Sequence, residues 1–235
     1  MARRMTNILL TGSSRGIGAA IAESLDQPGI ALVGHGTRSG IPADFADAAG
    51  PRLLWDAALE RLGTIDVLIN NAGIFEDNPL DRDADAWVAD WERTMRVNLT
   101  ASAELCRLAV LHWQQRGVGG RIVNVASRAA YRGDSPAHWH YAASKAGMVA
   151  MTKTIARGYA AEGILAFAIC PGFTMTGMAA DYLSSRGGEK LLADIPLGRV
   201  AEPGEVADVA RFLALEAPAS MTGSVIDVNG ASYVR

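Results

Sequence analysis

Short apolar runs alternate along the whole chain with longer segments that have helical spacing. The apolar runs show no regular polar positions, which is the pattern of strands in a sheet covered on both faces. The expected strands are Asn7–Thr11, Ile30–Val33, Val67–Ile69, Arg121–Val125, Leu165–Ile169 and Val225–Val228. The expected helices are Ile17–Leu25, Asp47–Leu62, Trp91–Arg116, Tyr141–Ala160 and Glu202–Leu215. This alternation predicts βαβ units, and therefore an α/β fold with a doubly wound parallel sheet.

No linker, internal repeat or low-complexity tract interrupts the alternation, so residues 1–235 are expected to form a single domain. Hydrophobic residues make up 49% of the chain, which excludes disorder. The two cysteines, Cys106 and Cys170, exclude a disulfide scaffold and favour a reducing cytoplasm. The net charge of −3 leaves no footprint for nucleic acid, and no apolar window is long enough to cross a membrane. No histidines and cysteines have metal-ligand spacing, so no metal is expected.

The segment from Thr11 to Gly18 reads TGSSRGIG and lies between the first expected strand and the first expected helix. Glycine in such a turn permits a positive φ and lets the backbone approach a phosphate closely. The N-terminus of the following helix offers free N–H groups and a partial positive charge. A strand before and a helix after this loop therefore predict nucleotide binding, and the alternative is a purely structural turn.

Tyr141 and Lys145 are four residues apart in a helical stretch and therefore point to the same face. An ammonium beside a phenol lowers the pKa of the phenol and brings it nearer the range useful for proton transfer. Ser127 follows the expected strand Arg121–Val125, at the strand end where ligands bind in open α/β sheets. The three residues are candidates for carbonyl chemistry, and the alternative is an ordinary helix surface and a strand-end cap.

With these motifs in this order, the sequence resembles the short-chain dehydrogenase/reductase family over almost its whole length. The motifs are TGxxxGxG at 11–18, NNAG at 70–73, Asn98, Ser127, YxxxK at 141–145, and PG at 171–172 followed by Thr176. The resemblance implies a Rossmann fold, a nicotinamide cofactor and a catalytic tetrad. In that tetrad, Tyr141 would protonate the carbonyl oxygen and Ser127 would hydrogen-bond it. Lys145 would bind the nicotinamide ribose and lower the tyrosine pKa, and Asn98 would hold a water in the proton relay.

The resemblance also implies a set of cofactor contacts. Asn71, Ala72 and Gly73 would lie against the adenosine ribose, and Thr176 would orient the nicotinamide amide. The full set is Gly12, Ser14, Arg15, Gly16, Ile17, Gly18, Arg38, Asp44, Phe45, Asn71, Ala72, Gly73, Tyr141, Lys145, Pro171, Gly172, Thr174 and Thr176.

The stretch after the second strand, GHGTR at 34–38, carries no carboxylate for a ribose 2′-hydroxyl. Arg15 in the glycine loop and Arg38 just after the strand are suited instead to a 2′-phosphate, which arginine binds bidentately. NADP(H) is therefore expected to be preferred over NAD(H). The alternative is that both arginines are solvated surface residues.

The helix that the family carries between its second and third strands is expected to be missing. Only nine residues separate Val33 from the expected third strand near Ala43–Ala46, and a helical crossover needs a dozen or more. In the family's pattern, Asp44 would accept a hydrogen bond from the adenine amine and the Phe45 backbone would donate one. The alternative places Asp44 in a polar loop.

Two segments are expected to shape the substrate pocket. Residues Ala137–His140 are bulky for a position just before Tyr141, which indicates either a wall for an aromatic or bulky substrate or interface packing. Met175–Gly198 resembles the family's substrate lid and carries Met178, Tyr182 and the glycines at 187–188.

Within the family, the sequence is most similar to bacterial 3-oxoacyl-[acyl-carrier-protein] reductases, which implies reduction of a 3-oxoacyl thioester. The alternatives are a reductase of another ketone, bulky or aryl, and a sugar or alcohol dehydrogenase. An alternative of another class is a non-catalytic nucleotide-binding regulatory protein. Arg121, Arg128 and Arg132 are candidates for a basic patch that binds an acyl carrier protein, whereas Glu162 and Phe167 argue against that partner.

The expected helix Tyr141–Ala160 is rich in small residues, which permit close approach of a second helix. In the family the matching helices pair between subunits. A homotetramer is therefore expected, with a dimer as the alternative.

Overall fold

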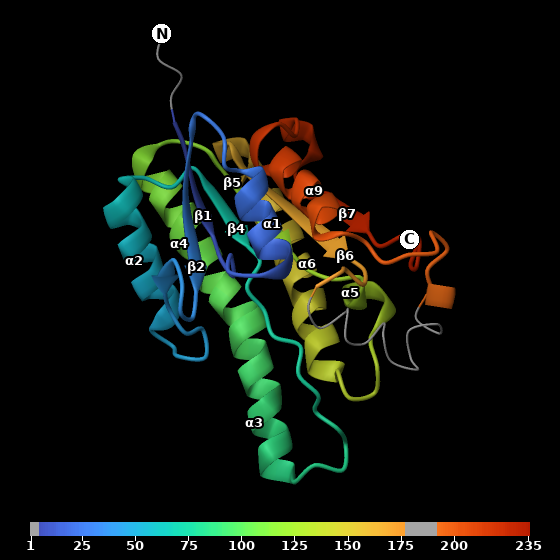
Figure 1. The fold of residues 1–235 in the computed structure, drawn as a ribbon. Coiled ribbons are helices and arrows are strands. Elements are labelled where there is room, and N and C mark those ends of the chain that lie inside the picture. Colours follow the sequence, from blue (N-terminus) through green and yellow to red (C-terminus); the bar gives the residue numbers. More distant parts are fainter. Residues whose placement is uncertain (1–4, 177–191) are drawn as a thin grey trace.

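The computed structural model describes residues 5–176 and 192–235. Its centre is one parallel sheet of seven strands in the order β3-β2-β1-β4-β5-β6-β7 (Figure 1). The strands are β1 (Thr6–Leu10), β2 (Ile30–Gly36), β3 (Ile41–Pro42), β4 (Val67–Asn70), β5 (Gly120–Val125), β6 (Ile164–Pro171) and β7 (Val225–Val228). The expected single-domain Rossmann-type sheet is confirmed.

Helices cover both faces of the sheet (Figure 1). The longer helices are α1 (Gly16–Ser24), α2 (Gly50–Leu62), α3 (Ala84–Met95), α4 (Ala101–Arg116), α6 (Trp139–Tyr159) and α9 (Pro203–Leu215). The short ones are η1 (Arg96–Thr100), α5 (Ala129–Arg132), η2 (Ala160–Glu162) and η3 (Ala219–Met221). None of the helices in the described ranges is both long enough and apolar enough to cross a membrane.

Two cores explain why the strands are apolar at consecutive positions. In β1, Leu9 packs into the core formed with α2, α4 and α6, whereas Ile8 and Leu10 pack into the core formed with α1 and α9. Successive side chains of a strand point to opposite faces, and here each face meets a helix layer. Consecutive residues such as Ile8, Leu9 and Leu10 therefore all lose their contact with water.

The segment expected to be one helix over Trp91–Arg116 is two helices joined by a π-helical turn. Helix α3 already begins at Ala84, because the Asp83 side chain caps it by accepting from the N–H groups of Asp85 and Ala86. The turn η1 then separates α3 from α4. The first turns of α3 extend beyond the sheet (Figure 1), and the Asp83 cap marks where the helix begins.

The expected loss of the helix between β2 and β3 is confirmed, since only the four residues 37–40 join the two strands. The expected position of β3 near Ala43–Ala46 is wrong, because the strand is Ile41–Pro42. Pro42 has no N–H to continue the ladder. Beyond it the chain turns, with the Asp44 carboxylate accepting from the N–H of Ala46 at 2.9 Å.

Trp113 of α4 is the largest fully buried side chain in the described part of the chain. Its indole Nε1 donates a hydrogen bond of 2.7 Å to the Ile65 carbonyl, in the loop that leads into β4. Its ring lies so close to Gly120 that a Cβ there would overlap it. Trp113 therefore fixes the position of α4 relative to β4 and β5.

We expect Trp113→Phe to lower the free energy of unfolding by about 2–3 kcal/mol, because it opens a cavity and strands the Ile65 carbonyl. Chemical denaturation monitored by circular dichroism measures the change. The matched control is Trp139→Phe, since the Trp139 side chain is 52% exposed and the loss there should stay below about 0.5 kcal/mol. Equal losses of unfolding free energy in the two variants would contradict the structural role given to Trp113.

Candidate active site

The predicted site residues gather at the carboxyl edge of the sheet. The glycine loop follows β1, residues Asn71–Gly73 follow β4, Ser127 follows β5 and Gly172 follows β6. In an open parallel sheet this edge is where ligands bind. The structure thus brings together segments that are up to 160 residues apart in the sequence.

Three glycines of the loop are required by its geometry. Gly12 and Gly16 have φ of +66° and +53°, a conformation that costs other residues energy. A Cβ at Gly12 would lie 2.8 Å from the Cα of Ala72, and a Cβ at Gly18 would overlap the carbonyl oxygen of Gly12. The loop is therefore packed as tightly as its sequence predicts.

The end of β4 holds this loop in place. The Asn71 amide donates to the carbonyls of Thr11 and Gly12 at 3.1 and 2.9 Å. The Thr11 hydroxyl accepts from the N–H groups of Asn71 and Ala72 at 2.9 and 3.0 Å. The resemblance places Asn71 and Ala72 against the adenosine ribose. In the structure the Asn71 side-chain amide is directed at the glycine loop. Asn70, the first residue of the NNAG motif, is buried and donates to Asn124 of β5.

His35 at the end of β2 is a site residue that the sequence reasoning missed. Its Nδ1 accepts from the Gly12 N–H at 3.2 Å, so its Nε2 carries the proton and donates to the Ala43 carbonyl at 3.0 Å. Its ring stacks on Phe45 with centroids 4.4 Å apart. Burial lowers the pKa of His35, in agreement with a neutral ring. The position of this histidine between Gly34 and Gly36, at the end of a strand next to the glycine loop, is the sequence feature that could have indicated it.

The residues at this edge fit the pyrophosphate of a nicotinamide cofactor. No side chain caps α1 at Arg15 and no acidic residue lies in its first turn, so its N-terminal N–H groups face the loop uncovered. A Cβ at Gly16 would meet the Thr176 methyl at 3.0 Å, which places Thr176 against the same loop. Gly172 is fixed by its N–H bond to the Val228 carbonyl at 2.9 Å, and the Thr174 hydroxyl donates to the Gly172 carbonyl at 3.2 Å.

Lys145 and Asn98 converge on Gly73. The buried Lys145 ammonium donates to the Val125 carbonyl at 2.9 Å, and a Cβ at Gly73 would lie 3.5 Å from its Nζ and 3.3 Å from the Asn98 Oδ1. The Asn98 side chain lies on the π-helical turn and forms two bonds with the Ile74 backbone, at 2.8 and 3.0 Å. Asn98 therefore positions the segment after β4, and its expected role with a water stays a prediction.

Ser127 and Tyr141 are in direct contact. The Ser127 side chain is hydrogen-bonded to Tyr141, and its Oγ also accepts from the Ala129 N–H at 3.1 Å. The Nζ of Lys145 lies 5.8 Å from the centroid of the Tyr141 ring. The serine hydroxyl, the phenol and the ammonium thus share one buried corner of the sheet edge.

The expectation that Lys145 lowers the pKa of Tyr141 is wrong for these side chains. Burial raises the pKa of Tyr141 to about 12, and the hydrogen bond from Ser127 offsets only part of that rise. Burial also lowers the pKa of Lys145 to about 8. Desolvation is the largest cause of both shifts, since it disfavours the charged form of each group. At neutral pH the phenol therefore keeps its proton.

Phe75 is a second residue that the sequence reasoning missed. Its ring meets the edge of Tyr141 at 4.8 Å between centroids and stacks flat on His138 at 3.9 Å. The His138 Nε2 lies 3.0 Å from an Asp77 carboxylate oxygen, and its Nδ1 is 2.6 Å from the Ser135 hydroxyl. Of the bulky segment before Tyr141, His138 thus lies against the ring that contacts the phenol, and the expected role of the segment as a substrate wall stays a prediction. The Phe75 side chain remains 42% exposed.

Several predicted residues lie apart from this centre. Arg121 is at the opposite end of β5, where it donates to the Leu213 carbonyl, so it cannot share a basic patch with Arg128 and Arg132. The lid residues Met178, Tyr182, Gly187 and Gly188 lie outside the described residues. Within the described ranges, no three His, Cys, Asp or Glu side chains are grouped to hold a metal ion.

Comparison with known proteins identifies the family. The sequence profile of the family described as enoyl-(acyl carrier protein) reductase matches residues 12–231. The chain is 34% identical to the 3-oxoacyl-[acyl-carrier-protein] reductase FabG of Vibrio cholerae, with 96% of each chain covered. The chain belongs to the short-chain dehydrogenase/reductase family. As a member, it is an oxidoreductase that acts on CH–OH or C=O groups and uses a nicotinamide cofactor, so a non-catalytic regulatory role is set aside.

Other short-chain dehydrogenase/reductase relatives broaden the comparison. Nodulation protein G of Rhizobium sp. strain N33 is 37% identical, with 94% of each chain covered. The ligand-free structure of aldohexose dehydrogenase from Thermoplasma acidophilum superimposes with a TM-score of 0.87 at 26% identity, over 99% of this chain and 95% of that one. The likeness thus extends over essentially the whole fold.

We expect the buried Lys145 ammonium to make stability depend on pH. Its pKa falls from 10.5 in the open chain to about 8 in the folded protein. Between these values the unfolded chain binds the proton more strongly, so raising the pH favours the folded state. Relative to Lys145→Met, the wild type should gain about 2–3 kcal/mol of unfolding free energy between about pH 7 and about pH 10.

Urea unfolding at a series of pH values measures this difference. Taking the difference between wild type and Lys145→Met cancels the opposing contributions of Tyr141 and the buried thiols, whose pKa values burial raises. The control is Lys153→Met, because Lys153 is exposed and its loss should leave the pH profile unchanged. A difference that stays flat up to about pH 10 would rule out the lowered pKa of Lys145.

Proposed function

We propose that this enzyme uses NADP(H) to reduce a ketone, and that the first substrate to test is a 3-oxoacyl thioester. The observation that carries the proposal is the contact of Ser127 with a protonated Tyr141 beside Lys145, at the sheet edge next to the glycine loop. A proton donor and a hydrogen-bond donor placed together are what a carbonyl oxygen needs when it becomes an alcohol.

In the proposed reaction, Ser127 donates a hydrogen bond to the carbonyl oxygen and Tyr141 transfers its proton to that oxygen. The pKa of about 12 keeps the phenol protonated at neutral pH, which is the form that reduction requires. Lys145, held by the Val125 carbonyl, would bind the ribose hydroxyls and stabilise the phenolate left behind. The nicotinamide cofactor, when bound, supplies the hydride that goes to the carbonyl carbon.

The 3-oxoacyl thioester is favoured by the names of the similar proteins, among them the Vibrio cholerae and Synechocystis 3-oxoacyl-[acyl-carrier-protein] reductases. An acyl carrier protein as the carrier of that thioester is less well supported. The expected basic patch is split between two ends of β5, and the exposed Glu162 bonds to Gln114. We therefore propose a thioester substrate and do not propose that an acyl carrier protein carries it.

A second candidate is a bulky or aryl ketone. The exposed ring of Phe75 beside Tyr141 favours it, because aromatic faces pack well against one another. A sugar substrate is supported only by the name of one structural relative, the aldohexose dehydrogenase of Thermoplasma acidophilum.

The proposed preference for NADP(H) is supported by the positions of Arg15 and Arg38 on two segments that contact each other. A Cβ at Gly36 would lie 3.3 Å from the Ser14 hydroxyl, so the glycine loop and the end of β2 are in contact. Arg15 and Arg38 extend from these two segments, and both are exposed. Two guanidiniums at one corner suit a 2′-phosphate. We further propose that the adenine lies near Asp44 and Phe45.

We also propose that the enzyme is a cytoplasmic homotetramer, with a dimer as the alternative. Its two cysteines are free thiols buried in the core, which agrees with a reducing compartment. The oligomer is proposed from the small residues of α6, such as Ala142, Ala143 and Ala146.

Replacing Tyr141 by Phe tests the chemical step. We expect kcat for ketone reduction to fall about 10²–10⁴-fold, because the proton donor is lost while the ring remains. Oxidation of NADPH is followed by its absorbance against acetoacetyl thioesters and a panel of aryl ketones. Tyr159→Phe is the control, since Tyr159 packs against the core away from this edge and should keep full activity. Unchanged turnover in Tyr141→Phe would exclude the proposed role.

The cofactor preference is tested with Arg38→Gln. Loss of one charge-assisted contact to the 2′-phosphate should raise KM for NADPH about 10–100-fold and leave KM for NADH unchanged. Arg61→Gln, at the end of α2, is the matched control for loss of a surface charge. If KM for both cofactors rose equally, the 2′-phosphate contact would be excluded.

A further inference from the structure

Arg128 directly follows Ser127, and its side chain is unusually well covered for an arginine. Only 11% of that side chain is exposed. Its backbone N–H donates to the Pro171 carbonyl at 2.9 Å, which ties it to the end of β6. The guanidinium lies over the ring of Phe173, with 5.2 Å from Cζ to the ring centroid. Arg128 is thus held beside two segments that carry predicted site residues.

One nitrogen of this guanidinium has no hydrogen-bond partner among the described residues. Its Nη1 is fully buried and finds no hydrogen-bond partner among the residues that the structure describes. The Asp194 carboxylate is 3.8 Å away, which is an ion pair but is too long for a hydrogen bond. A buried charged donor without an acceptor is costly, and native proteins rarely keep one without a reason.

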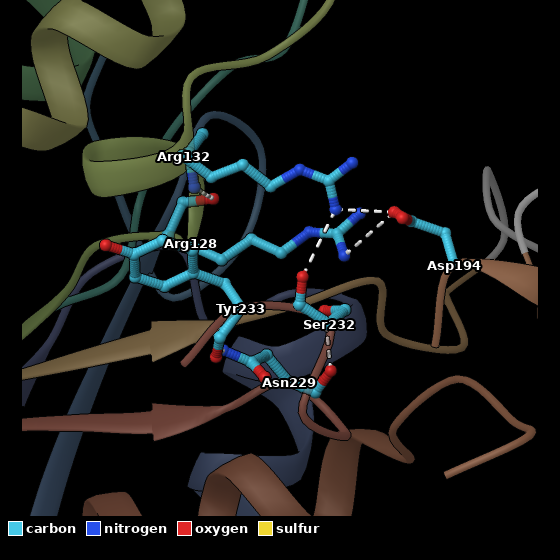
Figure 2. Close-up of polar contacts among 8 residues, drawn as sticks. Arg128, Arg132, Asp194, Asn229, Ser232 and Tyr233 are labelled. Carbon is cyan, nitrogen blue, oxygen red and sulfur yellow. Dashed lines mark hydrogen bonds and ion pairs between the residues drawn. The ribbon is translucent and has the colours of Figure 1, made fainter. Parts of the chain in front are cut away.

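The neighbouring Arg132 shows the opposite situation (Figure 2). Its Nη1 donates to the same Asp194 oxygen at 2.5 Å and to the Ser232 carbonyl at 3.3 Å. Ser232 belongs to a turn in which the Asn229 amide donates to the Tyr233 carbonyl at 3.0 Å. Arg132 therefore links Asp194 to the C-terminal turn by hydrogen bonds to both. Asp194 thus forms its hydrogen bond with Arg132. The Arg128 Nη1 has only the longer ion pair with Asp194 and no hydrogen-bond acceptor among the described residues.

We propose that Arg128 binds a carboxylate carried by the substrate, so that the preferred ketones or thioesters are those with a free acid group. The planar guanidinium matches a carboxylate in two parallel hydrogen bonds, and Asp194 shows that a carboxylate already approaches it. Because Arg128 directly follows Ser127, its backbone lies at the strand end where the proposed carbonyl would bind. The inference rests on the proposed reductase function and narrows its substrate class.

A structural explanation makes a different prediction. If Arg128 served only to hold Asp194, removing either partner would cost stability and no added acid would bind. If Arg128 is a binding residue, Asp194 competes with the ligand, and its removal strengthens binding. Asp194→Asn therefore separates the two explanations, because they predict opposite effects of added carboxylate on the same variant.

The first experiment measures binding without turnover. Thermal unfolding is recorded in sodium propionate and in sodium chloride at equal ionic strength. At about ten times Kd, propionate should raise the midpoint of the wild type by about 3–6 °C. The rise should disappear in Arg128→Gln and grow in Asp194→Asn. Arg128→Lys keeps the charge without the planar fork, so it should fold and show a smaller rise.

The second experiment measures selectivity. NADPH-dependent kcat/KM is compared for 2-, 3-, 4- and 5-oxo acids and for their methyl esters. The wild type should prefer one acid over its ester at least about 10-fold, and Arg128→Gln should remove this preference through KM with kcat retained. Equal losses for acid and ester, or a midpoint shift that does not depend on Arg128, would overturn the proposal. Propionate binding without reduction of any ketone would instead refute the reductase function alone.

Discussion

Asn71 and Thr11 join the ends of β1 and β4 by four hydrogen bonds, and the rest of the site depends on that joint. The bonds hold the glycine loop at a fixed distance from Gly73, and Gly73 in turn lies against Lys145 and Asn98. Side-chain to backbone bonds that are already formed cost little entropy when substrate binds, because the groups are already ordered. The position of the ammonium relative to the glycine loop thus depends on these two strand ends.

Much of this arrangement could be predicted from the sequence, because the strands are apolar on both faces and the glycines mark their ends. The last strand, Val225–Val228, lies where it was expected. Asn98, Ser127, Tyr141 and Lys145 were each tied to a motif with a fixed place relative to a strand or helix. What the motifs could not convey is the environment, and burial reversed the expected direction of the Tyr141 pKa shift.

The contacts that were missed depend on how distant segments meet. His35 lies 23 residues from Gly12, and only the pairing of β2 with β1 brings its ring to the loop. Phe75 reaches Tyr141 through a loop without regular structure. Asp194 meets Arg132 across 62 residues. None of these polar or aromatic residues belongs to a periodic pattern, so a single sequence does not reveal their partners.

The shortened connection after β2 has a consequence for the edge of the sheet. An exposed edge strand offers unpaired N–H and C=O groups to which other chains can add. Here that edge is β3, which has two residues, and the second of them is Pro42. A strand so short, and with one donor missing, is a poor template for strand addition. The loss of a helix next to the nucleotide site therefore also protects the sheet against edge-to-edge aggregation.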